Sequence, residues 1–302
     1  MQVFVTGGSG FVGTTLCTRL VKAGHSVTVL TRSQKAAERL PPGVEPCLGD
    51  PTRPGPWQER AAEHDAFVNL AGASIFNRWS QEYKELIRSS RIDTTRNLVQ
   101  AMGRRPRDAG PAVLVSASAV GYYGPQGDQE LGEDSPPGDD FLATLCRDWE
   151  AEARRARELG ALVVTARFGI VLGSRGGALG QMLPMFRKGL GGRLGSGGQW
   201  LSWIHQQDLV RALIFCLEKD LSGPANCTAP SPATNQELTK ALGRVLGRPT
   251  ILPAPGFAIK LVMGEMGSIV LTGQRVLPTA LLGAGFTFEF SELEGALKDL
   301  LG

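Results

Sequence analysis

The chain is poor in the residues that build disulfide frameworks and metal sites. Its 302 residues include five cysteines and three histidines. The cysteines are widely separated and form no Cys-x-x-Cys pair; they are Cys17, Cys47, Cys146, Cys216 and Cys227. This spacing is typical of reduced thiols in a cytoplasmic protein, and it predicts neither a disulfide framework nor a metal site.

Long apolar runs and a strong excess of one charge are also absent. No apolar run reaches the roughly 18 residues that a membrane span needs, and no signal peptide precedes the first predicted strand. The net charge is only +3, and the basic residues are scattered. The densest basic run, residues 104–107, is expected to end a helix at a solvated corner. We therefore expect a soluble cytoplasmic protein with no membrane or nucleic-acid partner.

The chain does contain short apolar strands that alternate with longer helical segments. This order is typical of a parallel sheet covered by helices on both faces. The predicted strands are 2–6, 26–31, 44–48, 66–71, 112–117 and 161–167, and the predicted helices lie near 11–24, 56–63, 80–103, 141–159, 177–189, 206–219, 235–247, 256–264 and 291–301. The pattern predicts a Rossmann-type, doubly wound α/β domain over 1–230 and a small α/β substrate lobe over 231–302. Capping-box sequences at Thr234 and Ser291 predict two helix starts in that lobe.

A glycine-rich turn follows the first predicted strand and opens a helix. Three of its glycines fit the pattern G-x-G-x-x-G, which is a strong signal when it joins a strand to a helix in a unit of roughly 30 residues. Such a turn lets backbone N–H groups approach a pyrophosphate at the helix N-terminus. The sequence therefore predicts a dinucleotide site, and the residues expected to form this part of it are Gly7, Gly10, Phe11, Val12 and Gly13.

The end of the second predicted strand indicates which dinucleotide binds. An NAD site usually has Asp or Glu here to accept hydrogen bonds from the ribose, but the first acid is Glu38. Arg32 and Lys35 instead offer cations that suit a 2′-phosphate. This pattern favours NADP(H). The alternative is that Arg32 ends the strand in solvent and contacts no ligand.

With the glycine turn, four further segments resemble the extended short-chain dehydrogenase/reductase superfamily, in its NAD-dependent epimerase/dehydratase branch. These segments are Asn69-Leu70-Ala71-Gly72, Ser116-Ala-Ser118, Arg167-Phe-Gly-Ile-Val-Leu-Gly173 and Trp203-Ile-His205-Gln-Gln-Asp208. The resemblance implies that Leu70, Ala71, Gly72 and Ser116 lie beside the cofactor, that Asp50 contacts its adenine, and that Ser118 holds the reacting oxygen of the substrate. Arg167, Trp203 and His205 are implied on the substrate side.

More narrowly, the chain is similar to the bacterial YfcH-like epimerase family proteins, which have a C-terminal domain of unknown function. The residues that carry this similarity include Arg78-Trp79, Ser90-Arg91-Ile92-Asp93, Trp149-Glu150 and the segment from Gly264 to Phe286. Some members have an old label as cell-division inhibitors. The resemblance implies an epimerase or oxidoreductase and, by analogy, a homodimer formed through the helices at 80–103 and 141–159.

The superfamily uses a Tyr-x-x-x-Lys pair on one helix, and this chain lacks it. In the corresponding helix, the possible positions hold Phe141 with Leu145 or Leu142 with Cys146. Tyr122 and Tyr123, on the loop after Ser118, are the candidate replacements, and each has the alternative role of lining the pocket. His205 is a third candidate, because its ordinary pKa is near neutral. Its alternative role is to cap a helix.

Arg78 and Trp79 are expected to bind an anionic, flat or sugar-like substrate, by bidentate contact and stacking. Arg167 has the alternative role of a buried partner for Asp208 or Glu150. Two functions follow from these observations. The chain is either an NADP(H)-dependent epimerase or oxidoreductase acting on a small, possibly nucleotide-sugar-like molecule, or a catalytically weak or inactive NADP(H)-binding regulatory protein.

Overall fold

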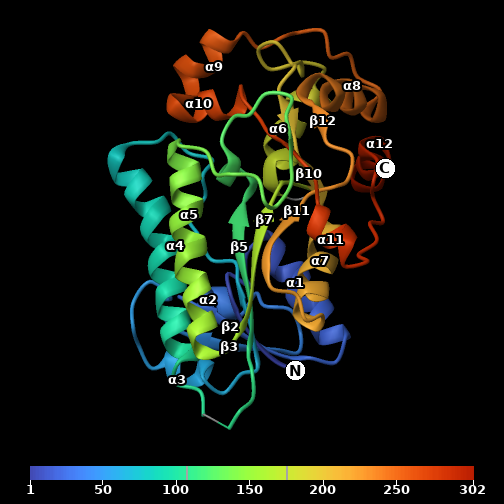
Figure 1. The fold of residues 1–302 in the computed structure, drawn as a ribbon. Helices are drawn as coiled ribbons and strands as arrows, with labels where there is room; N and C mark the ends of the chain where they lie inside the picture. The colour runs from blue at the N-terminus through green and yellow to red at the C-terminus, as the bar shows by residue number, and fades with distance from the viewer. Residues whose placement is uncertain (107, 175) are drawn as a thin grey trace.

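The computed structural model describes residues 1–106, 108–174 and 176–302, and its centre is a parallel sheet of seven strands. The strand order is β11-β7-β5-β4-β1-β2-β3 (Figure 1). The bounds are β1 Gln2–Thr6, β2 Ser26–Thr31, β3 Val44–Leu48, β4 Ala66–Asn69, β5 Val113–Ala119, β7 Leu162–Phe168 and β11 Gly223–Cys227. β1 pairs with β2 on one side and β4 on the other. The order reverses there, and open α/β sheets bind ligands at such a switch point.

Helices cover both faces of the sheet, as the sequence predicts. One layer contains α1 (Phe11–Lys22) and α7 (Gln206–Glu218), which pack against each other. The other contains α3 (Trp57–Ala61), α4 (Gln81–Met102) and α5 (Phe141–Arg154), and α4 and α5 lie side by side (Figure 1). The doubly wound α/β fold is thereby confirmed.

The alternation of side chains along β1 explains how the sheet packs against a helical layer on each face. Val3 and Val5 belong to the apolar core with α1 and α7, whereas Phe4 belongs to the core on the opposite face, with α3, α4 and α5. All three side chains are fully buried. Successive residues of a strand point to opposite faces, so a continuous apolar run is needed where both faces are covered.

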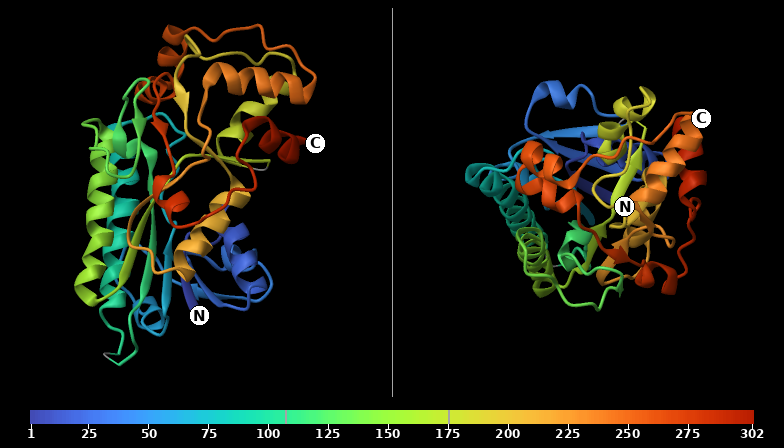
Figure 2. Two further views of the ribbon diagram at one scale, coloured as in Figure 1. Left: turned by 45° about the vertical axis from the view of Figure 1, so that its right-hand side comes forward. Right: turned by 90° about the horizontal axis from the view of Figure 1, so that it is seen from above.

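A second part of the fold lies beyond the carboxyl edge of the sheet (Figure 2). α11 (Thr279–Gly283) still belongs to the sheet domain, because it packs against β11 and its Leu281 lies in the core with α1 and α7. The elements of the second part are β8 Ile170–Gly173, α6 Gly177–Arg187, β9 Trp200–Leu201, β10 Trp203–His205, β12 Ala233–Thr234, α8 Asn235–Leu246, α9 Gly256–Met263, α10 Glu265–Val270, β13 Arg275–Val276 and α12 Leu293–Leu301. Their apolar core joins side chains from 170–205 to side chains from 229–301. The lobe is therefore built with residues that precede the predicted boundary at 230, and that boundary stays a prediction.

A short strand of the lobe connects it to the sheet domain. β13 pairs with β6 (Glu130–Leu131), whereas β10 and β8 pair with each other inside the lobe. The helix start predicted at Thr234 is confirmed, with both hydrogen bonds of the capping box to Glu237. The capping box predicted at Ser291 is wrong, because α12 begins at Leu293 with Glu292 as its N-cap and no side-chain cap bond.

Within the described ranges, no helix is long and apolar enough to cross a membrane, and no group of three metal-ligating side chains comes together. The basic run at 104–107 follows α4, but it is not fully solvated. Arg104 binds Gln58, and Arg105 donates to the carbonyl oxygen of His64 at 2.9 Å. Arg107 lies outside the described residues.

Candidate functional site

The turn between β1 and α1 admits glycine alone at its closest points. Gly7 has φ +73°, and a Cβ there would lie 2.7 Å from the carbonyl carbon of Leu70. A Cβ on Gly13 would lie 2.3 Å from the carbonyl oxygen of Gly7. Gly10 is the exposed N-cap of α1, and Phe11 begins the helix. The turn is therefore tight on its inner side and open at the helix N-terminus, where anions bind.

The segment after β4 lies directly beside this turn. Leu70 donates its backbone N–H to the carbonyl oxygen of Thr6 at 3.0 Å, and Gly72 is exposed. Thus Leu70, Ala71 and Gly72 face the same edge as the glycine turn. Among the described residues, this edge therefore brings the glycine turn next to Leu70–Gly72, both of which the sequence assigned to the cofactor. Val12, on α1, is half-buried.

Ser116 has a different environment from the other predicted cofactor residues. It is fully buried, and its Oγ accepts a hydrogen bond from Asn69 Nδ2 at 3.2 Å. Asn69 also accepts from Thr6 at 2.6 Å and donates to Thr95 at 2.8 Å. Asn69 therefore connects β1, β4, β5 and α4 beneath the site, a structural role that the sequence analysis did not foresee.

Arg32 and Asp50 lie together at the far side of the glycine turn, after β2 and β3. Arg32 is exposed, and Asp50 accepts hydrogen bonds from the backbone and hydroxyl of Thr52 at 3.0 and 2.7 Å. Burial raises the pKa of the Asp50 carboxyl, but the Thr52 hydrogen bonds and the charges of Arg32 and Arg53 outweigh it, and the pKa lies below its usual range. Arg32 thus stands near Asp50 without forming an ion pair among the described residues.

A buried ionic cluster lies at the carboxyl end of β5. Ser118 donates its hydroxyl to Glu150 Oε1 at 2.8 Å. Arg167 on β7 binds both carboxylate oxygens of Glu150, with Nε–Oε1 at 2.8 Å and Nη2–Oε2 at 3.0 Å. Each of the three residues is at most 2% exposed. Of the two roles open to Arg167, the structure displays that of buried partner to Glu150.

Tyr123 belongs to the same cluster, and its phenol is fully engaged. Arg167 Nη1 donates to the Tyr123 hydroxyl at 2.9 Å, and that hydroxyl donates to Asn226 Oδ1 at 2.7 Å. The side chain is fully buried, and burial raises the pKa of Tyr123 to about 12. This tyrosine therefore fixes β7 to β11 instead of facing the cleft.

Tyr122 is half-buried, and it packs differently from its neighbour. The Arg167 guanidinium lies 3.5 Å from the centre of its ring, and the Tyr123 ring meets it edge-on at 5.3 Å. No hydrogen bond holds its hydroxyl among the described side chains. Tyr122 is thus a positioned aromatic ring with an available phenol.

The helix α5 shows what replaces the missing tyrosine and lysine. Cys146 is buried against the end of β5, where Ser118 and the backbone of Ala119 contact its thiol, and Leu142 faces Gly121 in the following turn. Phe141 instead packs edge-on against Trp79, at 5.2 Å. The pair that faces the site is therefore Leu142 and Cys146. Burial raises the pKa of Cys146 to about 12, so its thiol stays protonated at neutral pH.

Two of the predicted substrate residues, Arg78 and Trp79, lie on the loop between β4 and α4. Arg78 is exposed and has no ion pair in the described part of the chain. Trp79 is half-buried, and its indole N–H donates to the carbonyl oxygen of Ile75 at 3.0 Å. This loop is close to the lobe, because a Cβ on Gly264 would lie 3.8 Å from the Arg78 side chain.

Trp203 and His205, which were also predicted on the substrate side, are buried on β10. Trp203 is 2% exposed and donates its indole N–H to the carbonyl oxygen of Ser231 at 2.9 Å. His205 is the N-cap of α7, where its Nδ1 accepts from the backbone N–H of Gln207 at 3.1 Å. Its ring stacks on Phe290 at 3.9 Å. The capping role considered for His205 is therefore the one that the structure displays.

Comparison with known proteins places these features in a family. Residues 3–227 match the NAD dependent epimerase/dehydratase family, and residues 254–300 match a domain of unknown function, DUF1731. The chain belongs to the NAD dependent epimerase/dehydratase family. The predicted superfamily and the C-terminal domain of unknown function are both confirmed, and the protein is an NAD(P)-binding family member.

The relatives are similar over their whole length. The chloroplastic epimerase family protein SDR39U1 homolog of Arabidopsis thaliana is 42% identical, and the match covers 100% of this chain and 87% of the relative's length. YfhF of Bacillus subtilis is 38% identical, covering 100% and 98%. The crystal structure of human SDR39U1 with NADPH is 39% identical, with a TM-score of 0.87 and coverage of 99% of both chains. Because these relatives include a chloroplastic protein, a cytoplasmic location stays a prediction.

Proposed function

We propose that the cofactor of this chain is NADP(H). Gly7 and Gly13 let the turn pack against neighbouring backbone, and the exposed N-cap Gly10 leaves the N-terminus of α1 open to an anion, so the residues present fit a dinucleotide. Arg32 is exposed after β2, where no acid is available to bind a ribose 2′-hydroxyl. A human relative was crystallised with NADPH. When bound, the nicotinamide would supply hydride transfer, and the glycine turn, Asp50 and Leu70–Gly72 would hold the nucleotide.

Replacing Arg32 tests this cofactor preference. We expect Arg32→Ala to weaken NADPH binding about ten- to a hundredfold, the value of one charge-assisted contact, and to leave NADH binding nearly unchanged. Titration by nicotinamide fluorescence measures both affinities. Lys22→Ala is the control, because Lys22 is an exposed cation at the C-terminal end of α1, away from the glycine turn. Equal losses for the two cofactors would mean that Arg32 does not contact the 2′-phosphate.

The reaction that we propose is epimerase or oxidoreductase chemistry on a small, hydroxyl-bearing substrate of the nucleotide-sugar kind. The observation that carries it is the Ser118–Glu150–Arg167 cluster. Ser118 uses its single hydroxyl proton in a hydrogen bond to the Glu150 carboxylate. Arg167 balances the charge of that carboxylate. The Ser118 oxygen therefore offers lone pairs, which suit a substrate hydroxyl as hydrogen-bond donor. Glu150 acts through Ser118 and is a positioning residue.

Tyr122 is the residue that we propose for proton transfer. It follows Ser118 by four residues, its phenol is available, and Arg167 fixes its ring. Tyr123, by contrast, is buried with both hydrogen-bonding partners satisfied. Arg78 and Trp79 are then the substrate contacts, since the cation of Arg78 is exposed and that of Arg167 is committed to Glu150. Such a pair suits an anionic, flat or sugar-like ligand.

A second candidate function rests on α5. Leu142 and Cys146 occupy the two positions that face the site, and neither has a group that exchanges protons at neutral pH. An NADP(H)-binding regulatory protein with weak or no turnover, for example one that acts in cell division, needs the glycine turn but not Tyr122. A homodimer through α4 and α5 also stays a prediction.

Turnover distinguishes the two functions. NADPH oxidation is followed across a panel of carbonyl compounds and nucleotide sugars, after binding has been shown by fluorescence. The enzyme proposal predicts turnover that falls at least a hundredfold in Ser118→Ala and Tyr122→Phe, with unchanged NADPH affinity. Binding without turnover anywhere would favour the regulatory function. Turnover that survives Tyr122→Phe would remove Tyr122 but keep the enzyme.

A further inference from the structure

The helix α9 has an apolar outward face, which is unusual for a helix at a protein surface. Ile259 faces inward and is buried, whereas Phe257, Leu261 and Val262 are 77%, 78% and 75% exposed. A surface helix normally has polar residues on its outward side. Here Lys260 is the only charged residue of α9. The outward face of α9 therefore has the composition of a contact surface without its partner.

The apolar surface continues beyond α9 onto two neighbouring segments. On one segment, Ile251 is 79% exposed and Leu252 is 50% exposed. On the other, Met185 is 50% exposed and Leu190 is 49% exposed. These segments touch. Ala254 donates its backbone N–H to the carbonyl oxygen of Arg193 at 2.9 Å, and a Cβ on Gly189 would lie 3.5 Å from Pro249. We call residues 185–193 and 248–262 the end surface.

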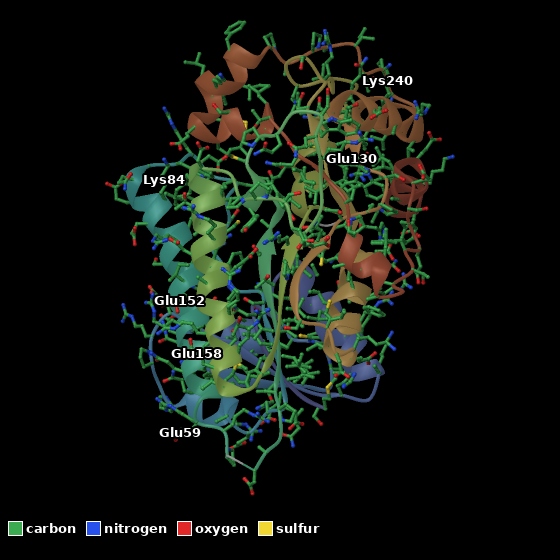
Figure 3. The ribbon with its side chains drawn as sticks, in the orientation of Figure 1. Glu59, Lys84, Glu130, Glu152, Glu158 and Lys240 are labelled. Carbon is green, nitrogen blue, oxygen red and sulfur yellow. The ribbon has the colours of Figure 1, made fainter. Side chains whose placement is uncertain are left out.

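The end surface lies at one end of the molecule, on the side away from α3 and from α2 (Gln34–Ala37) (Figures 1 and 2). It is beyond the carboxyl edge of the sheet, near the N-terminal end of α4, where Lys84 binds Glu265 of α10 (Figure 3). A flat body could approach this end without contacting the sheet or the helices α1 and α7.

The charge of the end surface has a single sign. Its exposed ionisable residues are Arg187, Lys188, Arg193, Arg248 and Lys260. No Asp or Glu occurs in residues 159–207 or 238–264, although the chain has 29 acids in total. Lys240 of α8 lies at the same end (Figure 3). A second copy of this surface would bring like charges together, which opposes self-association. The charges favour an anionic partner.

We propose that the end surface binds an anionic lipid membrane peripherally. Amphipathic helices that lie in the membrane interface combine Phe and Leu with Lys and Arg, and bury the apolar side chains among the lipid headgroups. Phe257, Leu261 and Val262 protrude enough to insert in this way. The basic residues then meet the lipid phosphates. The expectation of no membrane partner rested on the length of apolar runs, and a peripheral contact needs no such run.

Vesicle sedimentation tests the proposal with the full-length protein. We expect it to bind vesicles of about three parts phosphatidylcholine to one part phosphatidylglycerol at least tenfold more tightly than vesicles of phosphatidylcholine alone. Raising the salt concentration from about 0.1 M to 0.5 M should release it, because salt screens the charges. Absence of binding to the anionic vesicles, or equal binding to both compositions, would overturn the proposal.

Variants then locate the contact. Phe257→Ser with Leu261→Ser, and separately Arg248→Glu with Lys260→Glu, should each weaken vesicle binding at least tenfold. Leu282→Ser is the matched control for the first pair, since Leu282 is an exposed leucine (48%) on α11, outside the end surface. Lys22→Glu is the control for the second pair. Both controls should bind as the natural protein does.

Two further measurements keep the result interpretable. NADPH affinity should be the same in all variants, because none lies in the proposed cofactor site, and this shows that the fold is intact. Light scattering should find the same mass for the natural protein and for the Phe257, Leu261 variant. A dimer that dissociates in this variant would make the end surface a self-interface and overturn the membrane proposal.

Discussion

The glycine turn after β1 and the helix α5 face the same edge of the sheet, but they differ in how closely they follow the family. In the turn, Gly7 and Gly13 lie so close to other backbone atoms that no side chain fits. On α5, Leu142 faces Gly121 and Cys146 contacts Ser118, and neither side chain is a Tyr or a Lys. The cofactor side is therefore fixed by backbone geometry, whereas the chemistry depends on the side chains that α5 and its neighbours present.

Removing Arg167 should produce the largest effect, because Arg167 binds the buried Glu150 carboxylate beside α5. Arg167→Met keeps a long apolar side chain but leaves the buried Glu150 carboxylate with Arg154 alone, a partly exposed cation at 3.4 Å. We expect the free energy of unfolding at pH 7 to fall by about 3–5 kcal/mol. Urea denaturation measures it. Arg244→Met is the control, because Arg244 and its ion-pair partner Glu294 are both exposed, at 58% and 40%. A loss below about 1 kcal/mol would show that the cluster does not hold the site together.

A methyl group in the glycine turn tests the other side of the comparison. The Cβ of Gly13→Ala would collide with Gly7 and Gly8, at 2.3 and 2.6 Å. We expect the free energy of unfolding to fall by about 1–3 kcal/mol, with NADPH binding lost. Gly295→Ala is the control: no atom lies within 4 Å of its Cβ on α12, and it should be neutral or stabilising. NADPH titration beside urea denaturation separates the two effects, and unaltered NADPH binding by Gly13→Ala would contradict the assigned site.

The two tyrosines after β5 give a smaller and more specific test. Tyr123→Phe removes the hydroxyl that links Arg167 to Asn226, and we expect a loss of about 1–3 kcal/mol in the free energy of unfolding. Tyr122→Phe removes a hydroxyl with no hydrogen bond among the described residues, so its stability should change by less than about 0.5 kcal/mol. Turnover should show the reverse order. Equal stability of the two variants would mean that Tyr123 is not the structural member of the pair.

Local pattern explains which parts of the fold could be predicted. β1, the turn and α1 follow each other within 22 residues, and their apolar spacing and glycines need no distant partner. β11 was missed, because Gly223, Pro224 and Asn226 are typical of a loop. It becomes a strand through parallel pairing with β7, at the edge of the sheet, where proline is tolerated.

The candidate site was predictable in part, for the same reason. Ser118 could be identified from its strand and its motif. The partner of Arg167 could not be identified from the sequence, because Glu150 and Asp208 lie on different helices and either carboxylate could reach Arg167. In the structure Asp208 accepts from the backbone N–H groups of Glu289 and Phe290, at 3.0 and 2.8 Å. Only the packing of α5 and α7 on the sheet decides between the two carboxylates.

The smallest expected effect concerns His205, which distinguishes a structural histidine from a catalytic one. Burial lowers the pKa of His205 and outweighs the charges of Asp299, Asp208 and Glu289, which raise it. The unfolded chain therefore binds the proton more readily than the folded protein. The stability that neutral His205 contributes is present above the unfolded pKa of about 6.5 and is lost as the pH falls below it.

Replacing this histidine by asparagine separates the two roles. His205→Asn keeps an acceptor suited to a helix N-cap but does not titrate. Between pH 7.5 and 5.5 the natural protein should lose more free energy of unfolding than the variant, by up to about 1 kcal/mol. Urea denaturation at both pH values gives this difference, and the stability of the variant at pH 7.5 gives the cost of the lost ring packing. His64, whose pKa burial also lowers, titrates in both proteins and cancels. If turnover fell in His205→Asn while the pH dependence of stability stayed unchanged, His205 would belong to the chemistry and not to the helix cap.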